Sequence, residues 1–422
     1  MKSSSRRDNR QDTTHRILPF IIPLLMLGML SCSERRQADT TPWGTTLEQG
    51  EGEATHGGRS LPLDDIVANG ELIMATLSGP ETYYDYHNYG MGLQYLLCEK
   101  FAQSLGVSLR VDVCRDTAEM VRKVERGEAD VVAFQLPRSC RGLRFCGASI
   151  GSSNTQWAVG KDNSSLAKAL NDWFRPEMVA QTRKEENFLL SAGSVERHVY
   201  TPMLNRGAGI ISRFDAYFQQ YAQTARMDWR LLAAQCYQES CFDPRARSWA
   251  GARGLMQIMP ATAAHLGLPE ESVYNPQENI EAGARFLGQL QSLFSDIPQS
   301  QRANFVLASY NGGSRHIRDA MSLTKKYGGN PYNWNEVSQY VLKLTDPKYY
   351  QDPVAPHGYM RGYETVEYVR RIQSRYAQYC GFAAPGSFAS QGMPQRARKH
   401  HRFKYSLTNS MRSDALSRHY TM

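Results

Sequence analysis

The sequence predicts two domains of different fold class, an α/β domain followed by a mainly helical domain. The chain has 422 residues, which is more than one domain usually holds. Over residues 61–200, short apolar runs of strand type alternate with runs of helical period, as is typical of α/β units. Over residues 208–382 the apolar spacing is almost entirely helical. The net charge of +8 favours an anionic partner, but no zinc-finger spacing or RNA-binding aromatic signature occurs, so nucleic acid is not expected.

The first 32 residues have the pattern of an export signal. Basic residues precede an apolar run over residues 17–30, which is short for a membrane span but suits the core of a signal peptide. The run ends in Met-Leu-Ser-Cys, which resembles the lipobox of bacterial lipoproteins. This resemblance implies that residues 1–32 form a lipoprotein signal peptide and that Cys32 carries the lipid. The alternative is an ordinary cleaved signal peptide in which Cys32 has no special role.

Two further segments lack the pattern of a folded domain. Residues 33–60 contain few large apolar side chains and are expected to be a flexible tether. Residues 383–422 lose the apolar period and carry a basic cluster between Arg396 and Lys404. A disordered, solvated tail is one interpretation, and electrostatic attachment to the cell wall or to anionic lipid is the other. No later stretch suits a membrane helix, so any anchor is expected to be lipid. The lipoprotein resemblance implies that this anchor lies in the outer membrane, on its periplasmic side.

The elements expected in the α/β domain follow from the period of its apolar residues. Strands are expected at residues 71–77, 107–113, 129–134 and 155–159, and helices at residues 92–105, 118–127 and 164–173. A glycine before the first helix and the segments FAQSLGVSLRVD and VERGEADVVAF resemble family-3 extracellular solute-binding proteins. The resemblance implies a basic ligand-binding residue after the third strand, for which Arg138, Arg141 and Arg144 are candidates.

One lobe of such a solute-binding protein is missing from this sequence. The chain passes from the third strand almost directly to the strand at residues 155–159 and the helix at residues 164–173, which resemble the return to the first lobe. A cleft with one wall cannot bury most of a small ligand. We therefore expect a single-lobe domain, like one half of a solute-binding protein, that acts in docking or regulation. Retained small-molecule binding is the alternative.

The second domain is expected to consist mainly of amphipathic helices. They are expected at residues 210–221, from residue 229 onward, and at residues 279–294, 301–310, 334–344 and 363–379. Asp228 has the position and residue type of an N-cap for the second of these helices. Residues 195–206 are expected to link the two domains.

Glu239 ends the apolar helical run that begins at residue 229. A glycosidic oxygen is a poor leaving group, so a carboxylic acid with a raised pKa must protonate it as the bond breaks. Apolar neighbours raise the pKa of such an acid by desolvation, and those expected here are Leu232, Tyr237, Phe242 and Met259. The nearest acid in sequence, Asp243, precedes a proline and suits a turn. A single carboxyl favours a substrate whose own N-acetyl group assists the cleavage.

Four ordered segments stand out in the second domain. They are YQESCFDPRARSWAGARGLMQIMPATA, NPQENIEAGARFL, ASYNGG and YETVEYVRRI. In order and spacing they resemble the motifs of the lytic murein transglycosylases of the Slt type. The tract YYQDPVAPHGYMRGYETVEYV, together with the preceding solute-binding-like domain, points to the membrane-bound F-type subfamily. The resemblance implies a lysozyme-like catalytic domain over residues 208–382.

The resemblance also implies a substrate and a mechanism. Glu239 would act as the sole acid and base on peptidoglycan glycan strands, protonating the β-1,4 bond between N-acetylmuramic acid and N-acetylglucosamine. It would then take the proton of the muramyl C6 hydroxyl, which closes a 1,6-anhydro ring without water. No cofactor and no metal is implied, and neither a metal-ligand cluster nor a nucleotide-binding loop stands out. Cell-wall synthesis or remodelling proteins are further candidate partners.

Six further positions match substrate-binding residues of the family, namely Ser248, Gln257, Met259, Tyr310, Asn311 and Tyr368. Ser248 would contact the N-acetyl group or assist the intermediate, Gln257 and Met259 would line sugar subsites, and the Tyr368 hydroxyl would lie near the catalytic carboxylate. Each position also has a structural interpretation, as a loop cap, a partner of backbone groups or a core side chain. Asn311 also suits a turn with positive φ because two glycines follow it.

Other function classes remain open at this point. A muramidase would deliver water to the same bond, with Asp243 or Glu364 as its second carboxylate. A non-catalytic wall-binding or sensing lipoprotein would use both domains as scaffolds. Cys236 and Cys241 flank Glu239, but no histidine lies near them in the sequence, so a structural role is expected for both.

Overall fold

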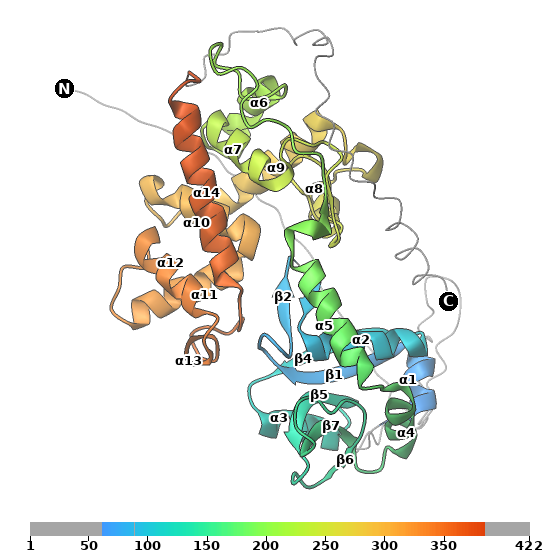
Figure 1. Cartoon of the computed structure of the whole chain (residues 1–422). Coiled ribbons are helices and arrows are strands. Elements are labelled where there is room, and N and C mark those ends of the chain that lie inside the picture. Colours follow the sequence, from blue (N-terminus) through green and yellow to red (C-terminus); the bar gives the residue numbers. More distant parts are fainter. Residues whose placement is uncertain (1–60, 88, 385–422) are drawn as a thin grey trace, which may run out of the picture. The chain divides into compact units, whose positions relative to one another are not determined.

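The computed structural model describes residues 61–87 and 89–384, and it contains the two classes of structure that the sequence predicts (Figure 1). An α/β region comes first, and a mainly helical region follows. The predicted signal peptide with Cys32, the predicted tether and the basic tail from residue 385 onward lie outside the described residues. Within the described part of the chain, no helix combines the length and the apolar character needed to cross a membrane.

The α/β region is built on a five-stranded sheet. Its strands and those of a small hairpin are β1 (Glu71–Leu77), β2 (Tyr84–Tyr86), β3 (Tyr89–Met91), β4 (Ser108–Cys114), β5 (Val131–Pro137), β6 (Leu143–Phe145) and β7 (Thr155–Gly160). The strand order is β4-β1-β5-β7-β6. Strand β1 pairs in parallel with β4 and β5, whereas β7 is antiparallel to both β5 and β6. The four predicted strands are confirmed, with ends that differ by a few residues, and β2, β3 and β6 are additions.

Helices cover both faces of this sheet. They are α1 (Leu63–Asn69), α2 (Leu93–Leu105), α3 (Thr117–Glu125), α4 (Ser164–Trp173), α5 (Glu177–Leu189) and the short η1 (Ala192–Ser194). Successive side chains of a strand point to opposite faces, so Met74 and Trp157 pack with α2 and α4, whereas Ala75 and Ala158 pack with α3. Burial on both faces explains why β1 and β5 are largely continuous apolar runs, whereas the edge strand β4 alternates apolar and polar residues.

The α/β region shows the single sheet that a one-lobe domain requires. Of the three candidate basic residues, Arg144 lies on β6 and donates to the carbonyl of Lys161 at 3.0 Å. Arg138 and Arg141 lie between β5 and β6. A ligand-binding role for any of the three stays a prediction.

The helical region contains the predicted helices, the helix α11, which was not predicted, and several shorter elements. The helices are α6 (Asp215–Ala225), α7 (Trp229–Ser240), α8 (Pro260–Leu266), η2 (Glu270–Ser272), α9 (Pro276–Leu293), α10 (Gln299–Gly312), α11 (Ser314–Lys326), α12 (Trp334–Lys343), α13 (Pro347–Tyr350) and α14 (Gly362–Cys380). The first helix starts later than predicted, because the Asp215 carboxylate accepts the backbone N–H groups of Ile211 and Ser212, both at 2.8 Å. The predicted N-cap is confirmed, since Asp228 accepts the N–H of Arg230 at 2.8 Å.

Helix α7 forms the centre of the helical region. Its residues from Trp229 to Cys236 are buried. The long helix α14 packs along α7 and also contacts α10 and α12 (Figure 1). This burial fixes the position of whatever side chain lies at the end of α7.

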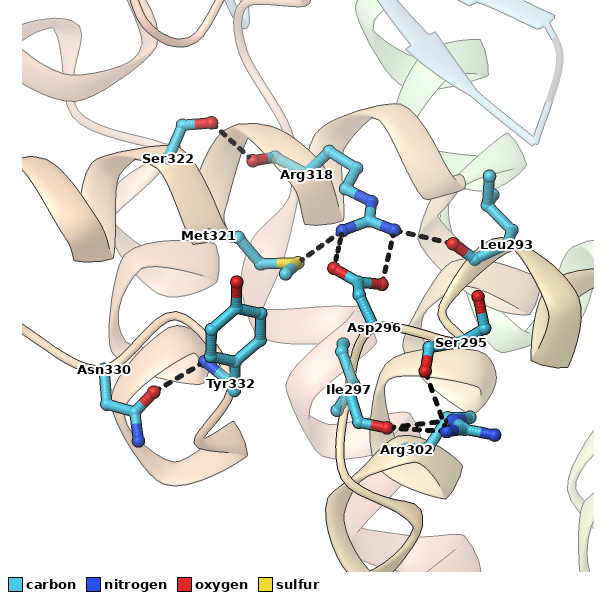
Figure 2. Close-up of polar contacts among 10 residues, drawn as sticks. All are labelled: Leu293, Ser295, Asp296, Ile297, Arg302, Arg318, Met321, Ser322, Asn330 and Tyr332. Carbon is cyan, nitrogen blue, oxygen red and sulfur yellow. Dashed lines mark hydrogen bonds and ion pairs between the residues drawn. The ribbon is translucent and has the colours of Figure 1, made fainter.

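An arginine on α11 fixes the turn between α9 and α10. Arg318 forms a bidentate ion pair with the carboxylate of Asp296, at 2.9 and 3.0 Å. It also donates to the carbonyl of Leu293 at 2.6 Å (Figure 2). Paired N–H groups of arginine match both oxygens of a carboxylate. A second arginine, Arg302 on α10, donates to the carbonyls of Ser295 and Ile297. Together they hold α9, α10 and α11 in register.

The segment predicted as a linker, residues 195–206, is attached to the helical region, and we call it the strap. Its strand β8 (Val195–Glu196) pairs antiparallel with β9 (Arg247–Ser248). Further along, the N–H of His198 donates to the Asp243 carboxylate at 2.6 Å. The N–H of Leu204 then donates to a backbone carbonyl, that of Ile211, at 2.9 Å. The strap therefore belongs structurally with the helices that follow it.

Asp228 is predicted to stabilise the fold through two separable contacts. The substitution Asp228→Ala removes the cap of α7 and also the ion pair with the buried Arg230, so thermal denaturation should show a loss of at least about 1 kcal/mol. Asp228→Asn is the matched control, because asparagine still caps the helix but carries no charge. An alanine variant as stable as wild type would contradict the prediction.

Candidate active site

Glu239 lies in the last turn of α7, immediately before a turn of unusual backbone conformation. Cys241 and Phe242 have φ values of 51° and 62°, so two successive non-glycine residues are left-handed. Side chains rarely adopt this conformation unless their surroundings hold them in it. Here the N–H of Cys241 donates to the carbonyl of Tyr237 at 2.9 Å, and the Phe242 ring is buried. The turn stops the helix and leaves the Glu239 side chain partly exposed.

The carboxyl of Glu239 accepts a hydrogen bond from the hydroxyl of Tyr368 on α14, with 2.5 Å between the two oxygens. Burial raises the pKa of Glu239 to about 7, while the Tyr368 hydrogen bond and the charge of Arg197 act in the opposite direction. Desolvation raises the pKa because it penalises only the ionised form, and it is the largest of the three effects. A carboxyl whose pKa is raised toward neutrality can first donate a proton and then accept one.

The loop after α7 carries Ser248, and its shape depends on that side chain. The hydroxyl oxygen of Ser248 accepts the N–H of Ala252, and the Ser248 N–H donates to the Ala252 carbonyl, both at 3.0 Å. At Gly254, φ is 76° and an added Cβ would lie 2.4 Å from the Asn279 amide nitrogen. Only glycine fits this position. Ser248 therefore has the loop-capping contact named as its structural alternative, and a role toward substrate stays a prediction.

Gln257 and Met259 occupy the far end of the same loop. Gln257 has a φ of 48°, and its side-chain amide donates to the carbonyls of Ala246 and Gly254 at 3.1 and 2.9 Å. This side chain satisfies backbone groups, which is its structural alternative. Met259 precedes the first residue of α8 and is partly exposed, so it is not a buried core residue.

Tyr310 and Asn311 lie in the last turn of α10, on the other side of the loop. The Tyr310 hydroxyl donates to the carbonyl of Met256 at 2.7 Å, and the nearby charge of Glu239 adds to the burial that raises the pKa of Tyr310 well above its usual value. Asn311 accepts a hydrogen bond from the hydroxyl of Thr365 on α14 at 2.8 Å. The turn prediction for Asn311 is wrong in one respect, because Asn311 is helical and the positive φ falls at Gly313.

The structure links two of the six predicted positions, Tyr368 and Tyr310, to the Glu239 carboxyl. Tyr368 contacts Glu239 directly, and Tyr310 lies within its electrostatic reach. Asn311 fastens α10 to the helix that carries Tyr368. Ser248, with Gln257 and Met259, belongs to the loop that leaves α7.

The two alternative carboxylates are occupied by other contacts. Asp243 accepts the N–H of His198 at 2.6 Å and that of Arg245 at 3.0 Å. Glu364 pairs with Arg361, at 2.7 Å from Nε and 2.6 Å from the terminal nitrogen. Among the described residues, no second carboxylate is hydrogen-bonded to the Glu239 network.

The cysteine next to Glu239 in the fold is unsuited to catalysis. Cys236 is fully buried on α7, and its thiol contacts the carbonyl of Leu255 at 3.4 Å. Burial raises its pKa well above the usual value, which disfavours the reactive thiolate.

Three residues that the motifs did not single out also shape the site. Asn279 is fully buried and accepts the N–H of Met256 at 2.8 Å, while its amide donates to the carbonyls of Arg253 and Val273. Gln235 lies one helical turn before Glu239 and is fully buried beside the Tyr368 hydroxyl. Arg197 of the strap reaches the backbone carbonyl of Glu239 at 3.0 Å. Spacing of four residues could have indicated Gln235, whereas no local signal indicates Arg197.

This arrangement suits transfer of a single proton in both directions. A neutral carboxyl can protonate an oxygen that leaves a breaking bond. The resulting carboxylate keeps its hydrogen bond from Tyr368, so the charge that develops is met by a donor already in place.

Comparisons of the sequence with known proteins find one family model and several named relatives. Residues 216–333 match the family model described as "Transglycosylase SLT domain". The chain is 27% identical, over 430 aligned residues, to "Membrane-bound lytic murein transglycosylase F" of Serratia proteamaculans, and the alignment covers 77% of this chain and 87% of the relative. A protein of the same name from Yersinia enterocolitica is 36% identical over 224 residues, which cover 52% of this chain and 45% of the relative.

Two solved structures are similar to parts of the chain. The lytic transglycosylase Slt from Pseudomonas aeruginosa, an inactive mutant, is 20% identical over 50% of this chain and 28% of its own, with a TM-score of 0.30. The arginine-bound form of domain 1 from TmArgBP is 18% identical over 28% of this chain and 98% of its own, with a TM-score of 0.24.

Glu239 is predicted to make the stability of the protein fall as pH rises. Its pKa in the folded state, about 7, lies above the ordinary value of 4.5, so the folded state holds the proton more tightly than the unfolded state. Ionising Glu239 as pH rises therefore costs the folded state free energy, and Glu239→Gln removes this cost. The stability of the variant relative to wild type should increase between pH 4.5 and 7, by at most about 3 kcal/mol. Thermal denaturation across this range measures the difference, and a constant difference would contradict the prediction.

Tyr368→Phe is predicted to raise the pKa of Glu239 further, because it removes the hydrogen bond that favours the carboxylate. Carbon-13 NMR of glutamate-labelled protein measures this pKa, with Glu239→Gln identifying the signal. Tyr310→Phe is the matched control, since the Tyr310 hydroxyl donates to a backbone carbonyl instead. The prediction fails if the signal titrates at the same pH in Tyr368→Phe and wild type.

Proposed function

We infer that the protein is a lytic murein transglycosylase that cleaves peptidoglycan strands with Glu239 as its acid. The observation that carries this inference is the single carboxyl with a pKa of about 7, hydrogen-bonded to Tyr368 and without a second carboxylate in its described network. The match to the transglycosylase family model includes α7 and the loop that follows it. The relatives named above extend the likeness over most of the chain.

The proposed reaction needs one proton that is given and taken back. Glu239 donates it to the oxygen of the β-1,4 bond between N-acetylmuramic acid and N-acetylglucosamine, and the sugar leaves as an alcohol. The N-acetyl group of the muramyl sugar assists at C1. The Glu239 carboxylate then accepts the proton of the C6 hydroxyl as O6 bonds to C1. The product is a 1,6-anhydro end, Glu239 is neutral again, and no water is consumed.

The alternative functions lack the groups that they require. A muramidase would need a carboxylate to hold the attacking water, and both Asp243 and Glu364 are already occupied by backbone or ion-pair contacts. A non-catalytic wall-binding protein gives no reason for a partly exposed carboxyl to keep a proton near neutral pH.

The loop from Ser248 to Met259 forms, in this proposal, one wall of the sugar-binding groove. Its hydrogen bonds support this role. Ser248 and Gln257 bond to backbone groups of the same segment, and Asn279 on α9 accepts the N–H of Met256. Tyr310 and Asn311 form the opposite side, at the end of α10. Met259 is partly exposed and lies at the end of the loop, where a sugar ring can pack against it.

The protein also belongs, in this proposal, at a membrane facing the cell wall. The relatives are named as membrane-bound, and the sequence provides a candidate anchor in a lipid on Cys32. In this proposal the lipid holds the protein in the outer membrane, on its periplasmic side. Residues 61–200 form a domain for docking or regulation, and residues 208–382 form the catalytic domain. Cell-wall synthesis or remodelling proteins are the proposed protein partners, and nucleic acid is not among them.

Digestion of purified peptidoglycan tests the proposed function. Mass spectrometry should find 1,6-anhydro ends and no new reducing ends in the wild-type digest. Glu239→Gln should release about 10²–10⁴-fold less product, the usual contribution of a general acid. Asp243→Asn is the control for the muramidase alternative and should keep the anhydro products. New reducing ends, or a Glu239→Gln variant as active as wild type, would refute the assignment.

A further inference from the structure

The charge of Arg197 lowers the pKa of the Glu239 carboxyl and so favours its ionised form. Its terminal nitrogen donates to the backbone carbonyl of Glu239 at 3.0 Å, and its charge favours the ionised side chain of the same residue. The side chain of Arg197 is half-buried. One guanidinium thus acts on both the backbone and the side chain of the catalytic acid.

The strap holds Arg197 on both sides. The residues just before it pair with β9, Val195 opposite Ser248 and Glu196 opposite Arg247. The residue just after it, His198, donates its N–H to the Asp243 carboxylate at 2.6 Å. The backbone of Arg197 is therefore held by residues 243 and 247–248, which lie in the segment that follows α7.

The end of a helix is a place where a cation is effective. The last carbonyl groups of α7 have no partner within the helix, and they give its C-terminus a partial negative charge. Glu239 acquires a full negative charge at the same place when it gives up its proton. A guanidinium bonded to the Glu239 carbonyl opposes both charges.

In the described part of the chain, the other ionisable groups that interact with Glu239 are neutral, whereas Arg375 on α14 lies over the Tyr237 ring of α7, 4.3 Å from its centroid. Tyr368 on α14, Tyr310 on α10 and Cys236 on α7 all have pKa values raised by burial, so none of them ionises near neutral pH. Arg197 is accordingly the charged partner that can offset the desolvation of the Glu239 carboxylate.

We propose that Arg197 is a positioning residue of the transglycosylase reaction, which holds the last turn of α7 and stabilises the Glu239 carboxylate formed when the glycosidic oxygen is protonated. This proposal rests on the proposed function. It explains why the strap is built into the helical region, since a free linker could not hold a cation at the end of α7.

The test compares Arg197→Gln, which keeps an N–H donor for the Glu239 carbonyl, with Arg197→Lys, which keeps the charge. In Arg197→Gln, kcat at neutral pH should fall about ten-fold, the size of one charge-assisted contact. The alkaline side of the pH profile should move to higher pH, because the carboxylate has lost its cation. Arg197→Lys should restore the wild-type pH profile. Arg206→Gln, an exposed arginine of the same strap, is the control and should match wild type.

A second readout requires no substrate. Carbon-13 NMR of the Glu239 carboxyl should show the same upward shift of its pKa in Arg197→Gln and a wild-type value in Arg197→Lys. If wild type yields no anhydro products, the proposed function fails while this titration still judges Arg197. The proposal is overturned if Glu239 titrates alike in Arg197→Gln and wild type, or if Arg197→Lys behaves like Arg197→Gln. If Arg197→Gln does not fold, Arg197→Lys alone decides. A pH profile of Arg197→Lys that is shifted from wild type would contradict a role of the charge.

Discussion

The hydrogen bond between Tyr368 and Glu239, in a place where burial opposes ionisation, is the interaction on which the rest of the site depends. Burial alone would make Glu239 a reluctant donor, because the carboxylate it leaves behind would be poorly solvated. A hydroxyl already aimed at the carboxyl supplies part of the solvation that water no longer gives. The balance leaves a pKa of about 7, at which one residue can serve as acid and then as base.

The backbone around this pair is built to hold it still. Helix α7 is buried along most of its length and ends abruptly at two left-handed residues, Cys241 and Phe242. The following loop is closed by its own side chains and fits only because Gly254 leaves room for Asn279. Close approach also requires a glycine at position 362, where a Cβ would lie 1.8 Å from the backbone carbonyl oxygen of Val341. Such over-determined backbone is how a fold keeps conformations that would otherwise be strained.

Local patterns in the sequence were sufficient for most elements and for the residues within motifs. Helical period and capping predict α7 with its Asp228 cap, and the motifs predict the pairing of Glu239 with Tyr368. Contacts between distant segments were beyond such patterns. The strap pairs with β9, far along the chain, and Asn311 on α10 accepts a hydrogen bond from Thr365 on α14. Arg197 was missed for the same reason, since it meets Glu239 only once the strap has folded.

Digestion of peptidoglycan in oxygen-18 water tests the central claim most directly, namely that Glu239 closes a ring without delivering water. At each new muramyl end, O6 of the same sugar replaces the glycosidic oxygen on C1. The account therefore predicts that cleavage brings no label into the products. Hydrolysis would instead place one labelled oxygen at every new end. Label at the new ends in proportion to the bonds cleaved would contradict the account.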